Sequence, residues 1–229
     1  MPETNRILVI APHADDETIG VGGTIARRAA EGDEVHVVIL TGHGDDPHPL
    51  WPPALWDEVR AEARRAAEVL GVASLNFAEI PAALVADQPK WKLNKIVGDW
   101  VEKVAPQTLF VPFLFDLHKD HREIFHAASV AWRPSSPVGR GIRRVFCSEV
   151  QSETHWNAPY VEAGFIPNTW IDISGHLETK LRAFACYASQ VREAPDARSL
   201  EAVRALATWR GSQQSMAAAE AFVAIRLLE

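Results

Sequence analysis

The apolar positions of the chain follow two spacings in turn, one typical of buried strands and one typical of helices. Residues 6–11 (RILVIA) form a continuous run of mostly branched apolar side chains, which predicts a strand buried on both faces of a parallel sheet. Residues 18–32 carry apolar side chains at helical spacing and end at Gly32, a typical helix stop. Another strand-like run at 34–44 completes a strand–helix–strand unit.

The same alternation continues to the end of the chain. It predicts further strands at 73–77, 108–113, 144–149 and 170–173. It predicts further helices at 56–70, 92–103, 122–132, 177–189, 199–209 and 217–228. Alternating strands and helices are typical of an α/β fold with a mostly parallel sheet. No linker interrupts the pattern and 229 residues suit one hydrophobic core, so we expect a single domain over residues 1–229.

Charge and cysteine content exclude several classes of function. The formal net charge is -7 and Lys and Arg form no basic stripe, so we expect neither nucleic-acid binding nor a polybasic membrane surface. No apolar run reaches the ~20 residues of a membrane span, and the first residues lack the pattern of a signal peptide. Cys147 and Cys186 belong to no CxxC motif, which excludes a thiolate zinc site and favours a reducing environment. We therefore expect a cytoplasmic protein without membrane partners.

Candidate chemistry appears where the first predicted strand ends. His13, Asp15, Asp16 and Glu17 follow that strand almost directly. Carboxylates crowded beside an imidazole repel or desolvate one another unless a cation is present, and His nitrogen and Asp oxygen are normal zinc ligands. His13 and Asp16, three residues apart, can converge on one ion, which leaves Asp15 to take a proton from water. A helix N-terminus favours acidic residues, which explains Glu17 and one aspartate but not His13.

A second cluster of the same chemistry follows the strand predicted at 108–113. Asp116, His118, Asp120 and His121 lie between that strand and the next helix. Ligands of open α/β sheets bind at the carboxyl ends of the strands, so we expect the two clusters to meet at one edge. Either His118 or His121 can complete a three-ligand metal site, and the other can act as a general acid or stabilise an oxyanion.

These segments resemble a known family. The residues APHADDE at 11–17 with the run that continues to Gly44, and HKDH at 118–121, are similar to the motifs of the PIG-L/LmbE-like metal-dependent de-N-acetylases. The usual family motif is AHPDDE. Here the proline precedes the histidine, as in one branch of the family, and the His-x-Asp-Asp spacing is intact. Later segments at 180–190 and 209–226 also resemble family members, so the likeness spans nearly the whole chain.

The resemblance implies a Rossmann-like three-layer α/β fold and one zinc ion, although His/Asp/His sites accept other divalent metals. The implied metal ligands are His13, Asp16 and His121. Asp15 would be the general base, and His118 would stabilise the tetrahedral intermediate and protonate the leaving amine. Asp120 would lie behind the ligands and hold a histidine tautomer.

Two residues are predicted to contact the substrate, from sequence features that are less specific than the metal motifs. The resemblance implies an arginine in the helix before LGV. Arg60 is its nearest match and Arg64 the alternative, and either can instead pair with a glutamate of the same helix. By the same likeness Asn168, just before the strand at 170–173, can reach the substrate.

Three functions fit these observations. The first is zinc-dependent removal of an N-acetyl group from an amino sugar or glycoconjugate, a small N-acetylated substrate. Trp51, Trp56, Trp156 and Trp170 lie in or near predicted loops, and such aromatic faces stack on sugar rings or pack in a core or interface. The second is hydrolysis of another small amide, such as a thiol conjugate or a natural-product intermediate. The third is a sugar-binding homologue without turnover, against which Asp15 argues because binding needs no base.

The loops expected around 43–55 and 150–170 are the regions we expect to set specificity. Neither carries a residue code from which the substrate can be named. The acidic, Trp-rich composition is compatible with a homo-oligomer of unspecified size.

Overall fold

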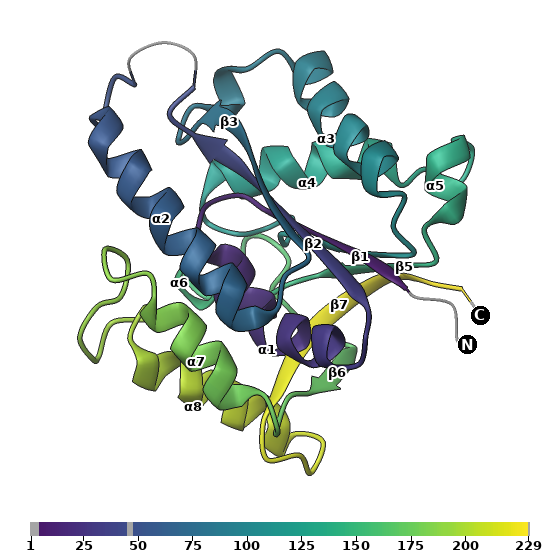
Figure 1. Cartoon of the computed structure of the whole chain (residues 1–229). Coiled ribbons are helices and arrows are strands. Elements are labelled where there is room, and N and C mark those ends of the chain that lie inside the picture. Colours follow the sequence, from purple (N-terminus) through teal and green to yellow (C-terminus); the bar gives the residue numbers. More distant parts are fainter. Residues whose placement is uncertain (1–4, 45–47, 229) are drawn as a thin grey trace.

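A seven-stranded sheet runs through the computed structural model, which describes residues 5–44 and 48–228 (Figure 1). The strands are β1 (Arg6–Ala11), β2 (Glu34–Gly42), β3 (Ser74–Pro81), β4 (Thr108–Val111), β5 (Arg144–Cys147), β6 (Thr169–Asp172) and β7 (Ala219–Leu227). Their order across the sheet is β3-β2-β1-β4-β5-β7-β6. The first five pair in parallel, whereas β7 runs antiparallel to both β5 and β6. The predicted, mostly parallel sheet is therefore confirmed.

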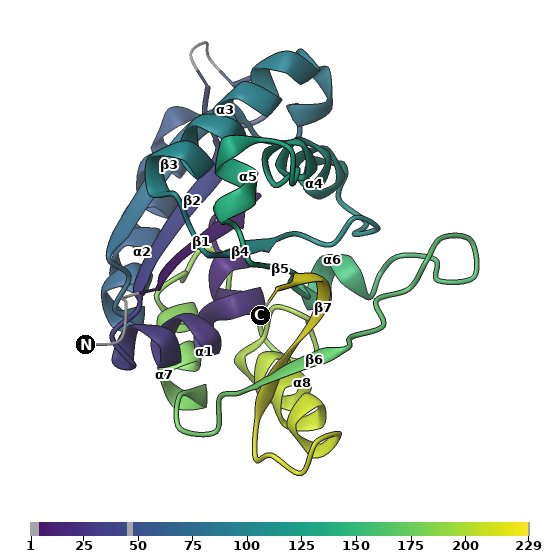
Figure 2. The same ribbon diagram turned by 90° about the vertical axis from the view of Figure 1, so that its right-hand side faces the viewer.

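Helices cover both faces of this sheet (Figures 1 and 2). One face carries α1 (Asp16–Ala30), α2 (Pro53–Leu70), α7 (Leu177–Ala185) and α8 (Leu200–Ser212), and the other carries α3 (Lys90–Val104) and α4 (Lys119–Ala131). Shorter helical turns, which the sequence did not predict, are η1 (Val85–Asp87), α5 (Pro137–Gly141) and α6 (Gln151–Thr154). An apolar core on each face completes three layers, which confirms the Rossmann-like fold. Within residues 5–44 and 48–228, no helix combines the length and apolarity that a membrane span requires.

The continuous apolar run of β1 is explained by its place in the middle of the sheet. The strand pairs with β2 on one side and β4 on the other. Ile7 and Val9 join the core under α1 and α7, while Leu8 and Ile10 join the core under α3 and α4. Because successive side chains of a strand point to opposite faces, a strand covered on both faces needs apolar residues at every position.

The helix predicted at 217–228 is wrong, because this segment forms β7. The Ala-rich run has high helix propensity, but propensity differences are below ~1 kcal/mol per residue and tertiary pairing overrides them. β7 pairs with β6 through residues 219–222 and with β5 through residues 223–227, so strand pairing covers its length. Phe222 of β7 is fully buried and packs 5.1 Å from the ring of Phe110 and 5.9 Å from that of Phe146.

The sheet brings the carboxyl ends of β1 and β4 side by side, and α1 and α4 begin just beyond them. Two loops flank this edge. In the loop expected at 43–55, residues 45–47 lie outside the described residues, and the remainder leads into α2. In the loop expected at 150–170, the chain forms α6 and then projects from the body before β6 (Figure 2).

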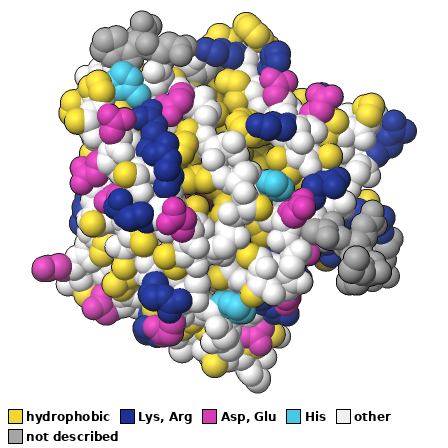
Figure 3. Space-filling model, in the orientation of Figure 1, with side chains coloured by type: hydrophobic (Ala, Val, Ile, Leu, Met, Phe, Trp, Pro, Cys, Tyr) yellow, Lys and Arg dark blue, Asp and Glu magenta, His cyan; other side chains and the backbone are white. Residues whose placement is uncertain are grey.

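Surface charge is mixed over the face that Figure 3 shows. Lys and Arg side chains lie there among Asp and Glu side chains rather than forming an area of one sign. Exposed ion pairs such as Arg27 with Glu31 on α1 and Lys95 with Asp99 on α3 join neighbouring turns of a helix. Exposed pairs of this kind each contribute little stability, so the fold rests on its two apolar cores.

Candidate active site

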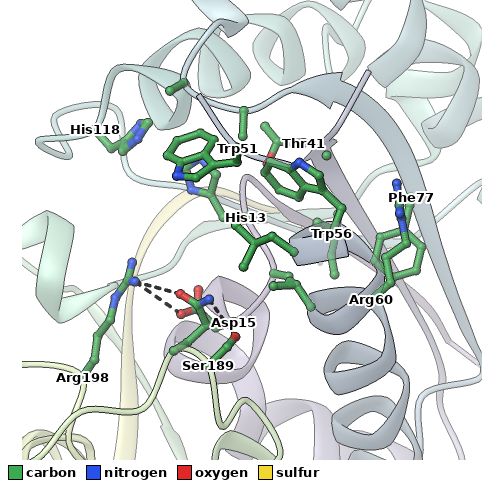
Figure 4. Close-up of a pocket in the computed structure, with 18 of the residues that line it drawn as sticks. His13, Asp15, Thr41, Trp51, Trp56, Arg60, Phe77, His118, Ser189 and Arg198 are labelled. Carbon is green, nitrogen blue, oxygen red and sulfur yellow. Dashed lines mark hydrogen bonds and ion pairs between the residues drawn. The ribbon is translucent and has the colours of Figure 1, made fainter. Parts of the chain in front are cut away.

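The turn after β1 carries the first cluster in an uncommon backbone conformation. Asp15, the residue before α1, has φ 108° and ψ -29°, and backbone of this kind costs a non-glycine residue about 1–3 kcal/mol. The His13 backbone N–H donates to Asp16 Oδ2 at 2.8 Å, and His13 Nδ1 lies 3.3 Å from the same oxygen. His13 and Asp16 therefore converge, while the Asp15 carboxylate faces Arg198 (Figure 4).

The turn after β4 brings two histidines to the same edge. His118 precedes α4 and is 34% exposed, whereas His121 in the first turn is buried. His121 Nε2 lies 3.2 Å from Asp16 Oδ2, so the two predicted clusters meet. Asp116 Oδ2 lies 2.8 Å from His121 Nδ1, and the Thr154 hydroxyl donates to the other Asp116 oxygen at 2.6 Å. The contact between Asp116 Oδ2 and His121 Nδ1 orients the His121 ring so that Nε2 faces Asp16.

His13, Asp16 and His121 form a donor set that suits a metal ion. One ligand atom from each lies within 4.8 Å of the others. Asp16 Oδ1 and His121 Nε2 are buried, and neither has a partner with hydrogen-bond geometry in the described part of the chain. Buried polar atoms are rarely left unpaired, and imidazole nitrogen and carboxylate oxygen are donors that zinc accepts. These three residues therefore fit such an ion.

An overlapping set, His13, His118 and Asp120, also has its donors within 4.8 Å. Its carboxylate is already in use, however. Asp120 Oδ2 accepts the Ala83 N–H at 2.6 Å and lies 3.0 Å from His13 Nε2, while Oδ1 accepts the Val85 N–H at 3.3 Å. The first set, with its unpaired buried atoms, fits an ion better. Asp120 lies against the His13 ring, where it can fix the tautomer.

Asp15 is buried beside these residues and lines a pocket. Neither of its carboxylate oxygens has a hydrogen-bond partner among the described residues. Burial raises the pKa of Asp15 to about 8, and the opposite charge of Arg198, whose Nη1 lies 3.8 Å from Asp15 Oδ2, acts in the other direction. A buried carboxylate with unpartnered oxygens at the pocket wall is placed to take a proton from water there, so the position of Asp15 suits a general base.

Glu17 holds the Asp15 backbone through a buried network. Glu17 Oε2 accepts the Asp15 N–H at 3.1 Å. Glu17 Oε1 accepts the hydroxyls of Thr18 and Tyr187, each at 2.6 Å. All three network side chains are buried. The favourable helix N-terminus therefore explains only part of the presence of Glu17, which also stabilises the left-handed residue before the helix.

His118 presents a neutral ring to the same pocket. Its Nδ1 accepts the Asp120 N–H at 3.2 Å, so the ring proton of the neutral form is assigned to Nε2. Burial, and next the neighbouring His13, lower the pKa of His118 to about 4, which keeps the ring neutral at pH 7. A neutral ring with its proton on Nε2 can donate a hydrogen bond to negative charge that develops in the pocket.

Of the residues described so far, His13, Asp15, His118 and Arg198 line one end of a pocket of about 370 Å³. Trp51, Trp56 and Phe77 line the other end (Figure 4). Two of the four tryptophans that we considered for stacking therefore reach the pocket, whereas Trp156 and Trp170 do not line it.

Of the two candidate arginines, Arg60 lines the pocket. Its Nε and Nη2 donate to the two carboxylate oxygens of Glu79 at 2.8 and 2.5 Å, and Nη1 donates to Asp57 at 3.2 Å. Arg64 instead lies over the ring of Phe77, 5.6 Å from its centroid. Arg60 is thus the candidate that the structure brings to the pocket, with a strand glutamate holding it in place.

Asn168 does not reach the pocket, so the structure does not support it as a substrate contact. Its side-chain Oδ1 accepts the Ala224 backbone N–H at 2.7 Å. The bond extends the pairing between β6 and β7. Sequence analysis missed this role because it assigned the partner segment to a helix.

Comparison with known proteins bears on the same residues. Residues 8–132 match the PIG-L family, described as GlcNAc-PI de-N-acetylase. The matched region spans more than half of the chain and contains both strand-end clusters. This chain belongs to the PIG-L family. The resemblance seen in the motifs is therefore confirmed.

Relatives of this PIG-L chain include deacetylases of amino sugars. A 1D-myo-inositol 2-acetamido-2-deoxy-alpha-D-glucopyranoside deacetylase of Actinosynnema mirum is 29% identical, with 81% of each chain covered. A diacetylchitobiose deacetylase of Thermococcus kodakarensis is 27% identical over 83% of this chain and 72% of its own. The solved structure of a 4-carboxy-2-hydroxymuconate hydratase from Pseudomonas putida has a TM-score of 0.76 at 23% identity, covering 99% of both chains. The last likeness shows the fold alone, and that protein is named for a different reaction, a hydration.

Sequence analysis of this PIG-L chain placed Asp116 in the second cluster without giving it a role, and it missed Arg198. Asp116 stands five positions before His121, and an aspartate near a candidate ligand is a usable signal that it supports that ligand. Arg198 comes from the loop between α7 and α8 and reaches Asp15 only through the fold. A lone arginine in a loop carries no signal of this kind.

Proposed function

We propose that this PIG-L chain is a metal-dependent N-deacetylase that removes the acetyl group from the amine of an amino sugar or glycoconjugate. One observation carries the proposal: a three-donor set with unpaired buried atoms borders a pocket through its member His13, and a buried carboxylate and a neutral histidine line the same pocket. A hydrolytic site needs these three elements together. The amino-sugar deacetylases among the relatives support the same reaction class.

His13, Asp16 and His121 would hold zinc or another divalent ion. When bound, such an ion acts as a Lewis acid on the amide carbonyl and lowers the pKa of water. Asp116 would keep the His121 ring in the ligating orientation, and Asp120 would do the same for His13.

Asp15 accepts a proton from the attacking water in this proposal. The water oxygen forms a bond to the acetyl carbonyl carbon, and negative charge develops on the carbonyl oxygen. His118 donates its Nε2–H as a hydrogen bond to that charge and keeps its proton, because its ring is neutral; it therefore does not protonate the amine itself, as the resemblance implied. The proton that Asp15 took from water passes to the amine nitrogen as the C–N bond breaks. Asp15 thereby returns to its carboxylate form, and the products are acetate and the amine.

Arg60 would contact the substrate from the pocket wall. We also propose that residues 1–229 act as one domain. The pocket combines residues from the region that matches PIG-L with Ser189 and Arg198, which lie beyond that region. The site therefore requires both parts of the chain.

Acetate release from a panel of N-acetylated amino sugars and non-sugar amides tests the proposal. Acetate release is measured after the metal has been removed with a chelator, and again after zinc, manganese or cobalt has been added back. The same measurement compares the variants His121→Ala and His126→Ala. Both histidines belong to α4, but His126 is exposed and lies outside the donor set. We expect metal-dependent release that His121→Ala abolishes and His126→Ala retains.

Three other outcomes would point elsewhere. Release from non-sugar amides alone would favour the second hypothesis, a different amidase. Bound metal without release from any amide would reject deacetylation and leave either another hydration reaction on the same fold or a binding protein. Folded protein that binds no metal would overturn the assignment of the ligands.

A further inference from the structure

The end of the pocket away from the metal ligands has a chemistry of its own. The residues that line it are Ile39 of β2, Phe77 of β3, Trp51 just before α2, and Leu55, Trp56 and Val59 in the first turns of α2. We call this region the aromatic recess. Figure 4 shows Trp51, Trp56 and Phe77 on the side opposite Asp15 and Arg198, with His13 between the two groups. A substrate amide at Asp15 would therefore direct its amine-bearing part toward the recess.

Stacked rings build the wall of the aromatic recess. The rings of Trp51 and Trp56 meet edge to face with centroids 5.9 Å apart. His48 packs behind both, 5.0 Å from Trp51 and 5.6 Å from Trp56. Both His48 nitrogens are occupied, since Nε2 lies 2.9 Å from the Ala82 carbonyl oxygen and Nδ1 accepts the Leu50 N–H at 3.1 Å. The wall is therefore preformed rather than assembled by a ligand.

Two polar side chains beside the aromatic recess, Thr41 and Arg60, already have bonded partners, whereas the buried indole Nε1 of Trp56 has no hydrogen-bond partner among the described residues. The Thr41 hydroxyl donates to the Pro12 carbonyl oxygen at 2.7 Å. Arg60 directs Nε and Nη2 to Glu79 and Nη1 to Asp57. A ligand hydroxyl that enters here gives up its bonds to water and gains the Trp56 Nε1–H as a partner, which replaces only one of them, so its burial is unfavourable. An apolar ring loses nothing of this kind and gains from burial.

We infer that the substrate carries an aromatic or similarly apolar group on its amine-bearing part, and that this group lies in the aromatic recess. The inference rests on the proposed deacetylase function and names its substrate class: an N-acetylated amine, such as an amino sugar, joined to an apolar aglycone. The pocket of about 370 Å³ has to hold the acetamide, the amine-bearing ring and this group together. The apolar group is therefore about the size of one ring.

Matched ligand pairs test the inference without depending on turnover. Calorimetry on the metal-loaded protein compares phenyl with methyl glycosides of glucosamine, which are products and cannot react. It also compares benzylamine with methylamine, which are likewise deacetylated and cannot react. We expect the phenyl member of at least one pair to bind about 30-fold more tightly, the factor expected for burial of one phenyl ring. Equal or undetectable binding of both phenyl members would overturn the inference.

Two variants assign the preference to the aromatic recess. Trp51 is 37% exposed, so Trp51→Ala removes a recess face without opening the core, and we expect it to lower the phenyl preference about tenfold. Trp91→Ala is the matched control, because Trp91 is 69% exposed on α3 and lies outside the pocket. Val59→Thr keeps the side-chain shape while adding a hydroxyl to the recess, and should also lower the preference. A preference that survives Trp51→Ala and Val59→Thr would place the phenyl group elsewhere.

Acetate release from the acetylated phenyl and methyl glycosides separates the two proposals. Release from both at equal efficiency, with equal binding of the products, would leave the deacetylase standing and reject the aromatic recess as a specificity site. If the phenyl ligands bind more tightly but no compound releases acetate, the aromatic recess stands as a binding site and the deacetylase proposal is rejected.

Discussion

The two ends of the pocket are built by different means. At the metal-ligand end, short turns after β1 and β4 supply buried charged side chains, and defined partners orient them: Asp116 for His121, and Glu17 for the backbone of Asp15. At the aromatic recess, one helix face and two strands supply apolar area, and Trp51 is partly open to solvent. The first end depends on the position of single atoms, whereas the second depends on surface area.

This difference predicts two kinds of response to substitution. A buried charge that loses its partner, or a reacting group that loses its proton acceptor, affects every substrate. Loss of apolar area affects only ligands that cover that area, in proportion to it. Variants at the two ends should therefore separate general loss of activity from loss of selectivity.

Asp15→Asn should have the largest effect. The variant keeps the shape of the side chain but cannot accept the proton of water, and removal of a general base typically costs about 10²–10⁴-fold in rate. We expect a fall of this size in kcat for phenyl and methyl substrates alike, with metal content unchanged because Asp15 is not in the donor set. Asp99→Asn on the exposed face of α3 is the control. Loss of bound metal in Asp15→Asn would instead make this residue a ligand.

Asp116→Asn should act mainly on metal affinity. The Asp116 carboxylate faces His121 Nδ1 at 2.8 Å, and replacing such a partner typically weakens metal binding by about 10–100-fold. Competition with a chromophoric chelator measures this change, and activity at saturating zinc should recover most of its normal value. If affinity is unchanged while activity falls, Asp116 acts on the reaction and not on the ligand.

The metal-ligand end could largely be predicted from sequence because its chemistry is local. His13 and Asp16 are three residues apart, and the turn after a buried strand fixes where they lie. His121 follows the neighbouring parallel strand, so the rule that ligands bind at carboxyl strand ends brought the clusters together. Strand and helix positions over the first 132 residues were predicted for the same reason, since each element carries its own pattern.

Features that depend on distant pairing could not be predicted in this way. β7 is a strand because its first half pairs with β6 and its second half pairs with β5, and neither neighbour is near it in sequence. The contact of Arg198 with Asp15 likewise depends on how α7 and α8 pack. The left-handed backbone of Asp15 could not be predicted either, because the residues around it are equally typical of an ordinary helix N-terminus.

Arg60→Gln tests whether Arg60 contributes to substrate binding. Arg60 lines the pocket while Glu79 holds its guanidinium, so we expect it to bind substrate without taking part in the reaction. Loss of one such hydrogen bond, worth about 1.4 kcal/mol, should raise KM about tenfold and leave kcat nearly unchanged. Steady-state kinetics of Arg64→Gln, an arginine of the same helix placed over Phe77, provide the comparison. Equal KM values for the two variants would reduce Arg60 to a partner of Glu79.

Tyr187→Phe should have the smallest effect on activity and tests how far the metal-ligand end depends on its support. The change removes the hydroxyl that donates to Glu17 at 2.6 Å and leaves the ring in the core. Glu17 keeps its bonds with Thr18 and with the Asp15 N–H, so the left-handed turn should loosen without collapsing. We expect a loss of about 1–2 kcal/mol in the free energy of unfolding and a fall in kcat of about three- to tenfold.

Thermal unfolding and kinetics have to be read together for this variant. Tyr160→Phe, at a side chain that is 90% exposed, controls for the loss of a hydroxyl as such. A lower kcat with unchanged KM and unchanged zinc affinity would show that the network positions Asp15. If stability falls and kcat does not, the bond from Tyr187 serves the fold alone, and the Asp15 turn is held by its own helix start. In that case the two ends of the pocket differ less than their bonding suggests. The metal-ligand end would keep its activity after losing a buried hydrogen-bond partner, just as the aromatic recess keeps its function after losing apolar area.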